Sequence, residues 1–472
     1  MQATDLAYLS VREAGALFRS RELSPVELTR ALIERTERFQ EALAPYVTFM
    51  PEQSLSEACA AEAAFLEGGD RASSPLLGIP VAYKDIVMTR GVRTTAGSAL
   101  HETFVPEIDA TVVKRWRAAG AVTMGKLITH EFALGLQPPE HAFRWARNPW
   151  NTGHIPGGSS SGSGTALAAG LVLGAIGTDT GGSIRNPASF CAISGLKPTY
   201  GRVSRHGVFT LSWTLDHVGP MARSVEDLAL LLNPLAGHDP ADPASAHAPV
   251  EDYTAGLARG VRGLRMGIPT NYFFDGAAEE VRAAVYGAAD VFRDQGADVR
   301  ELEVPCAELS PIVGVIMLSE AYAYHATDLR ESPQRYGRQL RNRILMGALY
   351  SASEYIQAQR ARQILRESIA AVMDRESGVD LLLTPANPEP APTYEAGLAA
   401  SMRRTRSYTS PFNLTGQPSL VVPCGLSGAG LPIGLMLSGR PFEESRTLSA
   451  GHAYQQSTDW HRRRPPLPST AQ

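Results

Sequence analysis

The sequence predicts an α/β fold in which helices cover the faces of a β-sheet. From about residue 75 onward, short apolar runs that indicate buried strands alternate with segments of helical spacing, as at 76–83, 110–119 and 121–124. This alternation is typical of sheets whose faces are covered by helices. At roughly 150 residues per domain, 472 residues could form three domains, but large α/β enzymes often exceed that length as one unit.

The N-terminal residues and the C-terminal part of the chain can be assigned from their patterns in the same way. The first 66 residues are expected to be helical, because Ser24, Pro25 and Glu27 form a helix-capping start and apolar residues then recur at helical spacing. The C-terminal part is expected to contain strands at 264–268, 299–304, 381–384, 419–423 and 433–437, with helices near 277–294, three within 311–376, and one near 443–455.

Charge and hydropathy exclude several classes of function. The formal net charge is −4, and the basic clusters at 403–406 and 462–464 are short, so we expect no nucleic-acid partner. No stretch approaches 18 uninterrupted apolar residues, and residues 1–20 lack the apolar centre of a signal peptide. We therefore expect no membrane association and a cytoplasmic location.

The cysteines indicate neither a disulfide framework nor a metal site. The four are scattered along the chain, with no C-x-x-C pair and no histidine at ligand spacing. Free, mostly buried thiols are expected at Cys59, Cys191, Cys306 and Cys424.

Residues 153–201 are unusually rich in glycine and serine, with an apolar run of helix length between two Gly/Ser clusters. Three short motifs in or near this segment lack the context that their chemistry needs. The G-x-S-x-G match at 158–162 follows a poor strand, and the S-x-x-K match at 194–197 is followed at once by Pro198. The P-loop-like spacing at 120–126 ends in Leu127, where the magnesium-binding Ser or Thr would stand.

A longer set of spaced motifs is far more specific. Gly157-Gly158-Ser159-Ser160-Ser161-Gly162-Ser163 is followed, 24 positions after Ser159, by Ser183 within Gly177-Thr178-Asp179-Thr180-Gly181-Gly182-Ser183-Ile184-Arg185. Gly78–Asp85 lies upstream, and Gly195–Gly201, Ser212–Pro220 and Pro418–Pro423 lie downstream. In this order and spacing the sequence resembles the amidase signature family from its N-terminal helices to about residue 457.

The resemblance implies one large α/β domain, a mixed twisted sheet wrapped by helices, over 1–472. Within it, a signature core of about 75–220 would lie between a helical region of about 1–66 and a C-terminal part of about 221–466. It also implies hydrolysis of carbon–nitrogen bonds in linear amides, with neither a metal nor an organic cofactor.

The same resemblance assigns three catalytic roles: nucleophile to Ser183, bridging serine to Ser159 and base to Lys84. A serine hydroxyl needs a base to take its proton, and Ser–Lys pairs are a known variant of that arrangement. Lysine can serve only when neutral, so its pKa of about 10.4 must fall by roughly three units, which burial can achieve. In the family the peptide bond between Gly158 and Ser159 is cis.

The loop before the nucleophile is expected to form an oxyanion hole. Gly181 and Gly182 let the backbone turn so that the N–H groups of Thr180, Gly181, Gly182 and Ser183 point at one spot. The neighbouring Thr178, Asp179 and Arg185 are interpreted as hydrogen-bonding struts, and none of the eleven histidines is expected to be catalytic.

The substrate is less constrained by the sequence. Phe143, Trp145, Phe209 and Trp213 are candidate substrate-binding residues, which favours a bulky N-aryl amide or a carbamate, as in a urethanase, although inward packing explains them equally well. The alternative is the glutaminase (A) subunit of a tRNA-dependent amidotransferase complex. The stretch 319–325 does not resemble the glutamine-binding stretch expected of that subunit. The oligomeric state is left open.

Overall fold

The computed structural model describes residues 3–68, 70–136, 142–306, 309–401 and 407–468. Its strands form one eleven-stranded sheet in the order β1-β3-β2-β4-β6-β5-β10-β11-β9-β7-β8. The pairs β2–β3, β2–β4, β7–β8 and β7–β9 are parallel and the other neighbours are antiparallel, so the sheet is mixed. The strands are β1 (Tyr46–Phe49), β2 (Pro80–Lys84), β3 (Val122–Leu127), β4 (Gly174–Asp179), β5 (Ser194–Lys197), β6 (His217–Ala222), β7 (Arg265–Pro269), β8 (Asp298–Leu302), β9 (Leu381–Pro385), β10 (Ser419–Leu426) and β11 (Pro432–Gly439).

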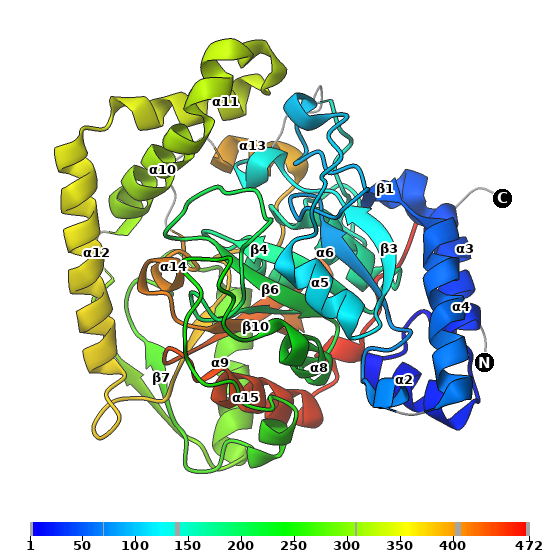
Figure 1. The fold of residues 1–472 in the computed structure, drawn as a ribbon. Helices are drawn as coiled ribbons and strands as arrows, with labels where there is room; N and C mark the ends of the chain where they lie inside the picture. The colour runs from blue at the N-terminus through cyan, green and yellow to red at the C-terminus, as the bar shows by residue number, and fades with distance from the viewer. Residues whose placement is uncertain (1–2, 69, 137–141, 307–308, 402–406, 469–472) are drawn as a thin grey trace.

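Helices surround this sheet (Figure 1). They are α1 (Ala3–Leu6), α2 (Val11–Ser20), α3 (Pro25–Leu43), α4 (Pro51–Glu67), α5 (Thr111–Ala118), α6 (Ser161–Ala168), α7 (Arg185–Phe190), α8 (Val225–Leu235), α9 (Glu279–Asp294), α10 (Leu309–Glu331), α11 (Arg338–Leu345), α12 (Ala352–Val372), α13 (Tyr394–Ser401), α14 (Pro411–Thr415) and α15 (Glu444–Ser457), with short 3-10 turns between them. No helix among the described residues is both long and apolar enough to cross a membrane.

The capping start expected before residue 26 is present. The Ser24 hydroxyl accepts a hydrogen bond from the Val26 N–H, and the Glu27 carboxylate accepts one from the Ser24 N–H, with Pro25 as the first helical residue of α3. This reciprocal arrangement satisfies backbone donors that a helix start otherwise leaves without partners.

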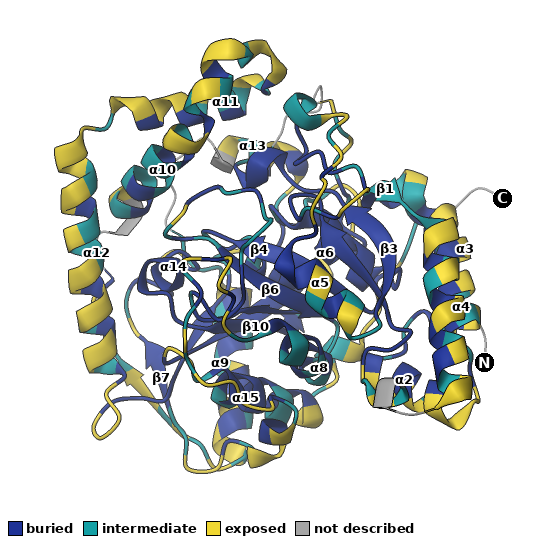
Figure 2. Cartoon of the chain, in the orientation of Figure 1, coloured by how far each residue is buried: buried dark blue, intermediate teal, exposed yellow. Residues whose placement is uncertain are grey.

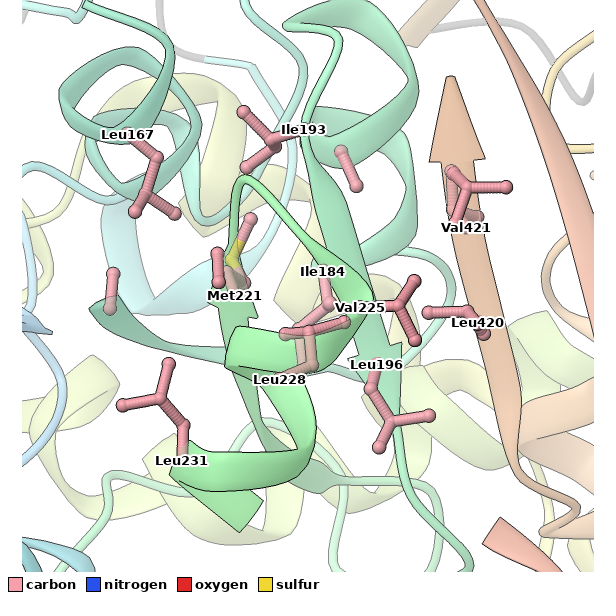
Figure 3. Packing of buried hydrophobic residues seen from close by; sticks show 14 of the residues in the cluster. Leu167, Ile184, Ile193, Leu196, Met221, Val225, Leu228, Leu231, Leu420 and Val421 are labelled. Carbon is pink, nitrogen blue, oxygen red and sulfur yellow. The ribbon is translucent and has the colours of Figure 1, made fainter. Parts of the chain in front are cut away.

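The central strands and the helices beside them share one large apolar core. Leu196 of β5, Met221 of β6 and Leu420 of β10 are fully buried with Val225 and Leu228 of α8 (Figure 3). The colouring by burial in Figure 2 shows the central strands buried and the outer faces of the peripheral helices exposed. Strand β8, at one end of the sheet, is mostly exposed. Because the central strands are covered on both faces, their sequences are continuously apolar or glycine-rich and do not alternate.

Candidate active site

Three segments that are far apart in the chain meet at the carboxyl ends of two neighbouring strands. Strands β2 and β4 are parallel neighbours, with Val81 paired to Gly174 and Tyr83 to Ile176. Their carboxyl ends therefore lie side by side, which places Lys84 at the end of β2 next to the loop that follows Asp179. The third segment, 157–160, immediately precedes α6.

Lys84 is fully buried and is held between two hydroxyl groups. Its Nζ donates hydrogen bonds to Ser159 Oγ at 2.7 Å and to Thr178 Oγ1 at 2.8 Å. Burial lowers the pKa of Lys84 to about 7, because removing an ammonium from water disfavours the charged form, while the carboxylates of Asp179 and Asp216 oppose this shift. Near neutral pH a large fraction of Lys84 is thus the free amine.

Ser159 follows a cis peptide bond from Gly158 and is itself buried. A Cβ at position 158 would collide with the imidazole ring of His130, so only glycine fits there. The N–H of Ser160, the next residue, donates to the Ser183 carbonyl at 3.2 Å, which ties this segment directly to the second serine.

Ser183 lies at intermediate exposure in the loop between β4 and α7. Its hydroxyl makes no hydrogen bond to any residue in the described part of the chain, whereas Ser159 is engaged by Lys84. The hydrogen bond between a nucleophile and its base is often long or poorly aligned in an enzyme without substrate, and it shortens when the substrate binds.

The glycines of this loop have different surroundings. Gly182 has φ +127°, a conformation that side chains rarely adopt, and a Cβ there would collide with Thr409 Oγ1. The Thr409 hydroxyl donates to the Gly181 carbonyl at 2.6 Å. The Gly182 N–H donates to Asp179 Oδ1 at 2.8 Å, so it is already used, contrary to the expectation that it points into an oxyanion hole. The remaining candidates for that role are the N–H groups of Thr180, Gly181 and Ser183.

A buried ion pair holds the loop in place. The guanidinium of Arg185 donates to both carboxylate oxygens of Asp179, at 2.8 and 3.0 Å, and both side chains are fully buried. Arg185 also donates to Asn413 Oδ1 and to the Thr409 carbonyl, and Asn413 Nδ2 donates to Asp179. Burial opposes ionisation of Asp179, but Arg185 outweighs it and holds the pKa of the carboxyl far below its usual range. Thr178, Asp179 and Arg185 are therefore hydrogen-bonding struts, as the sequence predicted.

A second buried lysine stands on the neighbouring strand. Lys126 Nζ donates to the Val87 carbonyl and to Thr94 Oγ1, both at 2.6 Å, and lies 3.5 Å from Asp85 Oδ1. Burial lowers the pKa of Lys126 to about 8, and Asp85 opposes this shift. This cluster fixes the chain just after Lys84, and its bonding is directed away from the two serines.

A cleft that opens to solvent adjoins the site. It reaches Thr178 and Thr180, the neighbours of Lys84 and of the nucleophile loop. The apolar part of its lining includes Ile86, Val208, Phe209, Leu211 and Trp213.

The charged groups that line the cleft already have partners. Arg205 lies 3.5 Å from Asp242 Oδ1 and donates to the Trp213 carbonyl. Asp216 accepts from the Thr180 hydroxyl at 2.6 Å and from the N–H groups of Leu211 and Ser212, and burial raises its pKa to about 6.

The four aromatic residues proposed for substrate binding divide into two pairs. Phe209 and Trp213 line the cleft, and Trp213 is 54% exposed. Trp145 instead packs between the ring of Tyr394 and the guanidinium of Arg147, and Phe143 lies beneath Arg93; neither lines the cleft. The inward-packing explanation thus accounts for Trp145.

Several supporting residues were not found from sequence. Asn413 and Thr409 lie more than 220 positions from the loop they support. Asp216 carried no signal beyond its place in the family-like stretch 212–220, and Lys126 appeared only in the P-loop-like spacing at 120–126, which was set aside. No group of three or more His, Cys, Asp or Glu side chains among the described residues is arranged to hold a metal ion. The described structure also leaves all four cysteines free, with only Cys59 exposed.

Known proteins resemble this chain in sequence and in structure. The family model for Amidase matches residues 27–448. A curated relative from Chloroflexus aggregans, the A subunit of glutamyl-tRNA(Gln) amidotransferase, is 43% identical over 98% of this chain and 99% of its own length.

Two solved structures show the same fold. One is a chain from a vestigial protein complex that reveals the evolutionary origins of an s-triazine catabolic enzyme; it is 33% identical, with a TM-score of 0.87 over 95% of this chain and 98% of its own. A bacterial aryl acylamidase of the amidase signature enzymes is 26% identical, with a TM-score of 0.87 over 96% and 97% of the two chains.

Proposed function

This chain belongs to the amidase signature family, and from that premise we propose that it hydrolyses the C–N bond of a linear amide through an acyl-Ser183 intermediate. The observation that carries the proposal is the position of Lys84. A fully buried amine with a pKa of about 7 lies 2.7 Å from the hydroxyl of Ser159, and Ser159 immediately precedes the residue that bonds the Ser183 backbone. A base that is neutral near pH 7 is what a serine nucleophile requires.

The proposed reaction proceeds in two halves. Neutral Lys84 accepts a proton from Ser159 as Ser159 accepts the Ser183 proton, and Ser183 Oγ bonds to the substrate carbonyl carbon. The N–H groups of Thr180, Gly181 and Ser183 are proposed to stabilise the negative oxygen that forms. The proton returns through Ser159 to the leaving nitrogen, the C–N bond breaks, and water then attacks the acyl ester by the same route to release the acid and regenerate Ser183.

A fluorophosphonate probe tests the nucleophile directly. We expect stoichiometric labelling of the wild-type chain. Because the tryptic peptide 148–185 contains both Ser159 and Ser183, fragment-ion spectra of that peptide are needed, and we expect them to place the mass increment on Ser183. The Ser160→Ala variant serves as a control, because Ser160 lies in the same cluster but its hydroxyl bonds only the Thr178 backbone. Labelling of Ser159 with Ser183 unmodified would contradict the assignment.

For the substrate, the relatives support glutamine more directly than they support a carbamate. The 43%-identical relative is named as one component of glutamyl-tRNA(Gln) amidotransferase, and the match spans both chains almost completely. We therefore propose as the leading candidate that Ser183 releases ammonia from glutamine for use by a protein partner. Ammonia release from glutamine that is stimulated by a co-purifying second chain would support this role.

One observation favours a second candidate, an uncharged substrate such as an N-aryl amide or carbamate. Glutamine carries an ammonium and a carboxylate, and each needs a charged or strongly polar partner. The charged side chains of the cleft, Arg205, Asp216 and Asp242, are bound to neighbours, and Glu320 nearby accepts from Ser212, Thr214 and Tyr355. The apolar lining of the cleft would instead bury a ring, at about 25 cal/mol per Å².

Steady-state kinetics separates the two candidates. The kcat/KM values for glutamine, for an anilide, for an N-aryl carbamate and for a small primary amide are measured on the same preparation. A preference for glutamine of tenfold or more supports the amidotransferase setting, whereas a preference for the N-aryl compounds supports the apolar cleft. Inactivity toward all four, together with no fluorophosphonate labelling, would remove both.

A further inference from the structure

Exposed apolar side chains are concentrated on one edge of the molecule. Five of the twelve large apolar side chains that the described residues expose lie within 345–364: Leu345, Met346, Leu349, Ile356 and Ile364. The last two project from α12 and are 57% and 65% exposed. Figure 2 shows α12 at the periphery, with an exposed face along its length. Soluble monomers seldom gather exposed apolar residues in this way, so the edge indicates an interface.

The two faces of α12 differ sharply. Ala358, Leu365 and Ile369 are buried against the rest of the molecule. The opposite face carries Ile356, Arg360, Ile364, Glu367 and Ala371, all exposed. On an ideal helix of 3.6 residues per turn these five positions fall within about 80° of arc, so they form one continuous stripe.

The order of charges along this stripe makes it self-complementary. Arg360 and Glu367 are seven residues apart, which is two turns and about 10.5 Å. If a second copy of α12 lies antiparallel so that Arg360 faces the partner's Glu367, the twofold symmetry also places Glu367 opposite the partner's Arg360. The same arrangement brings the two Ile364 side chains together beside the axis and places Ile356 near the partner's Ala371. Opposite charges and apolar groups therefore match without any change in the backbone.

We propose that α12 is a self-association surface through which two copies of this chain pair about a twofold axis next to Ile364. Such an isologous contact uses the same patch on both copies. A single helix face is smaller than the about 800 Å² per partner of a standard interface, so the dimer is expected to be reversible, with a Kd in the micromolar range. The proposal is independent of the proposed function, and its failure leaves the chemistry at Ser183 untouched.

Sedimentation velocity of the full chain from about 1 to 100 µM tests the proposal. The weight-average mass is expected to rise from the monomer value of 50.6 kDa toward twice that value. Ile364→Glu is expected to remove the rise, because it sets two carboxylates against each other beside the axis. Leu66→Glu, which alters an equally exposed side chain on α4, is the matched control and is expected to associate like the wild type.

A charge swap gives the sharpest result. Arg360→Glu sets a carboxylate opposite the partner's Glu367 at both symmetry-related positions and is expected to weaken association at least tenfold. The double variant Arg360→Glu/Glu367→Arg re-creates both ion pairs in reverse and is expected to restore it. A wild-type chain that stays monomeric at 100 µM, association that survives Ile364→Glu, or a double variant as weak as the single one would each overturn the proposal.

Discussion

The side chains of Lys84 and Ser159 meet at 2.7 Å although 75 positions separate them, and both are buried. Lys84 ends a strand, whereas Ser159 stands just before a helix, so their contact depends on how β2 and α6 are packed.

Replacing Lys84 by arginine keeps a positive charge and hydrogen-bond donors but removes the possibility of a neutral amine. We expect kcat to fall on the order of 10²–10⁴, the range typical of losing a general base. Single-turnover kinetics with an ester or amide measures the acylation step directly. An arginine variant within tenfold of wild type would show that Lys84 is not the base.

The wild-type rate is expected to depend on pH with a defined sign. Burial lowers the pKa of Lys84 to about 7, and only its deprotonated form can accept a proton, so kcat/KM should rise from pH 5.5 through about 7 and level off above 8. Asp216 has a pKa of about 6 and bonds Thr180. In an Asp216→Asn variant an inflection that persists, moved to lower pH because the Asp216 carboxylate no longer raises the pKa of Lys84, assigns the inflection to Lys84. An inflection that vanishes with Asp216 contradicts this assignment.

Ser183→Ala is expected to abolish hydrolysis and fluorophosphonate labelling while leaving the melting temperature within a few degrees of wild type. The hydroxyl makes no internal hydrogen bond to the described residues, so its removal leaves no buried group without a partner. Acid release quantified by mass spectrometry gives the rate. Residual activity above a tenth of wild type would be incompatible with the assignment.

The two loop glycines offer a matched pair of alanine substitutions. Gly182→Ala forces a side chain into φ +127° and against Thr409, whereas at Gly181 a new methyl would only approach Ser410 Oγ at 3.4 Å. We expect Gly182→Ala to lower kcat on the order of 10²-fold, similar to the loss of an oxyanion donor, and Gly181→Ala to cost much less. If the two substitutions lowered kcat equally, the backbone conformation at Gly182 would not be what the reaction rate depends on.

Arg185→Ala is expected to destabilise the fold by about 3–5 kcal/mol, because it leaves the buried Asp179 carboxylate without its main cationic partner. Urea unfolding followed by tryptophan fluorescence measures the loss. In the double variant Asp179→Asn/Arg185→Met neither charge is buried alone, so its cost should be smaller than that of Arg185→Ala. A single-variant cost below 1 kcal/mol would contradict the structural role assigned to the pair.

Much of the fold was predictable because amphipathic helices and short apolar runs leave clear patterns. Helix α9, expected near 277–294, spans Glu279–Asp294, and the strand expected at 381–384 spans Leu381–Pro385. Strand β1 lies within the first 66 residues, which were expected to be helical throughout, so that expectation was wrong for 46–49. Strands β4, β5 and β6 were not anticipated either, because their glycine-rich and fully buried sequences show no alternation. The family-like motifs singled out Lys84, Ser159 and Ser183, and the structure brings the segments that carry them together at the carboxyl ends of β2 and β4.

The surroundings of the site were less accessible to sequence reasoning. Aromatic content alone could not distinguish Trp213, which lines the cleft, from Trp145, which packs on Tyr394 and Arg147. The distinction depends on tertiary contacts between segments some 250 positions apart. The oxyanion role expected of the Gly182 N–H failed for a similar reason, since the orientation of Asp179 is set by Arg185 and Asn413.

The loop between β5 and β6, which forms much of the cleft wall, has a consequence for how such enzymes diversify. It carries Phe209, Leu211 and Trp213. It is anchored through Asp242 and Glu320, and its backbone is also hydrogen-bonded to Ile86 and Met88, just after Lys84. Its link to the nucleophile loop is the contact between Asp216 and Thr180. Phe209 and Leu211 are buried and pack with Ile86, whereas Trp213 is mostly exposed. Substitutions at position 213 can therefore alter the cleft wall with little effect on the packing around Lys84, so the substrate range of this scaffold can drift at that position while its chemistry is retained.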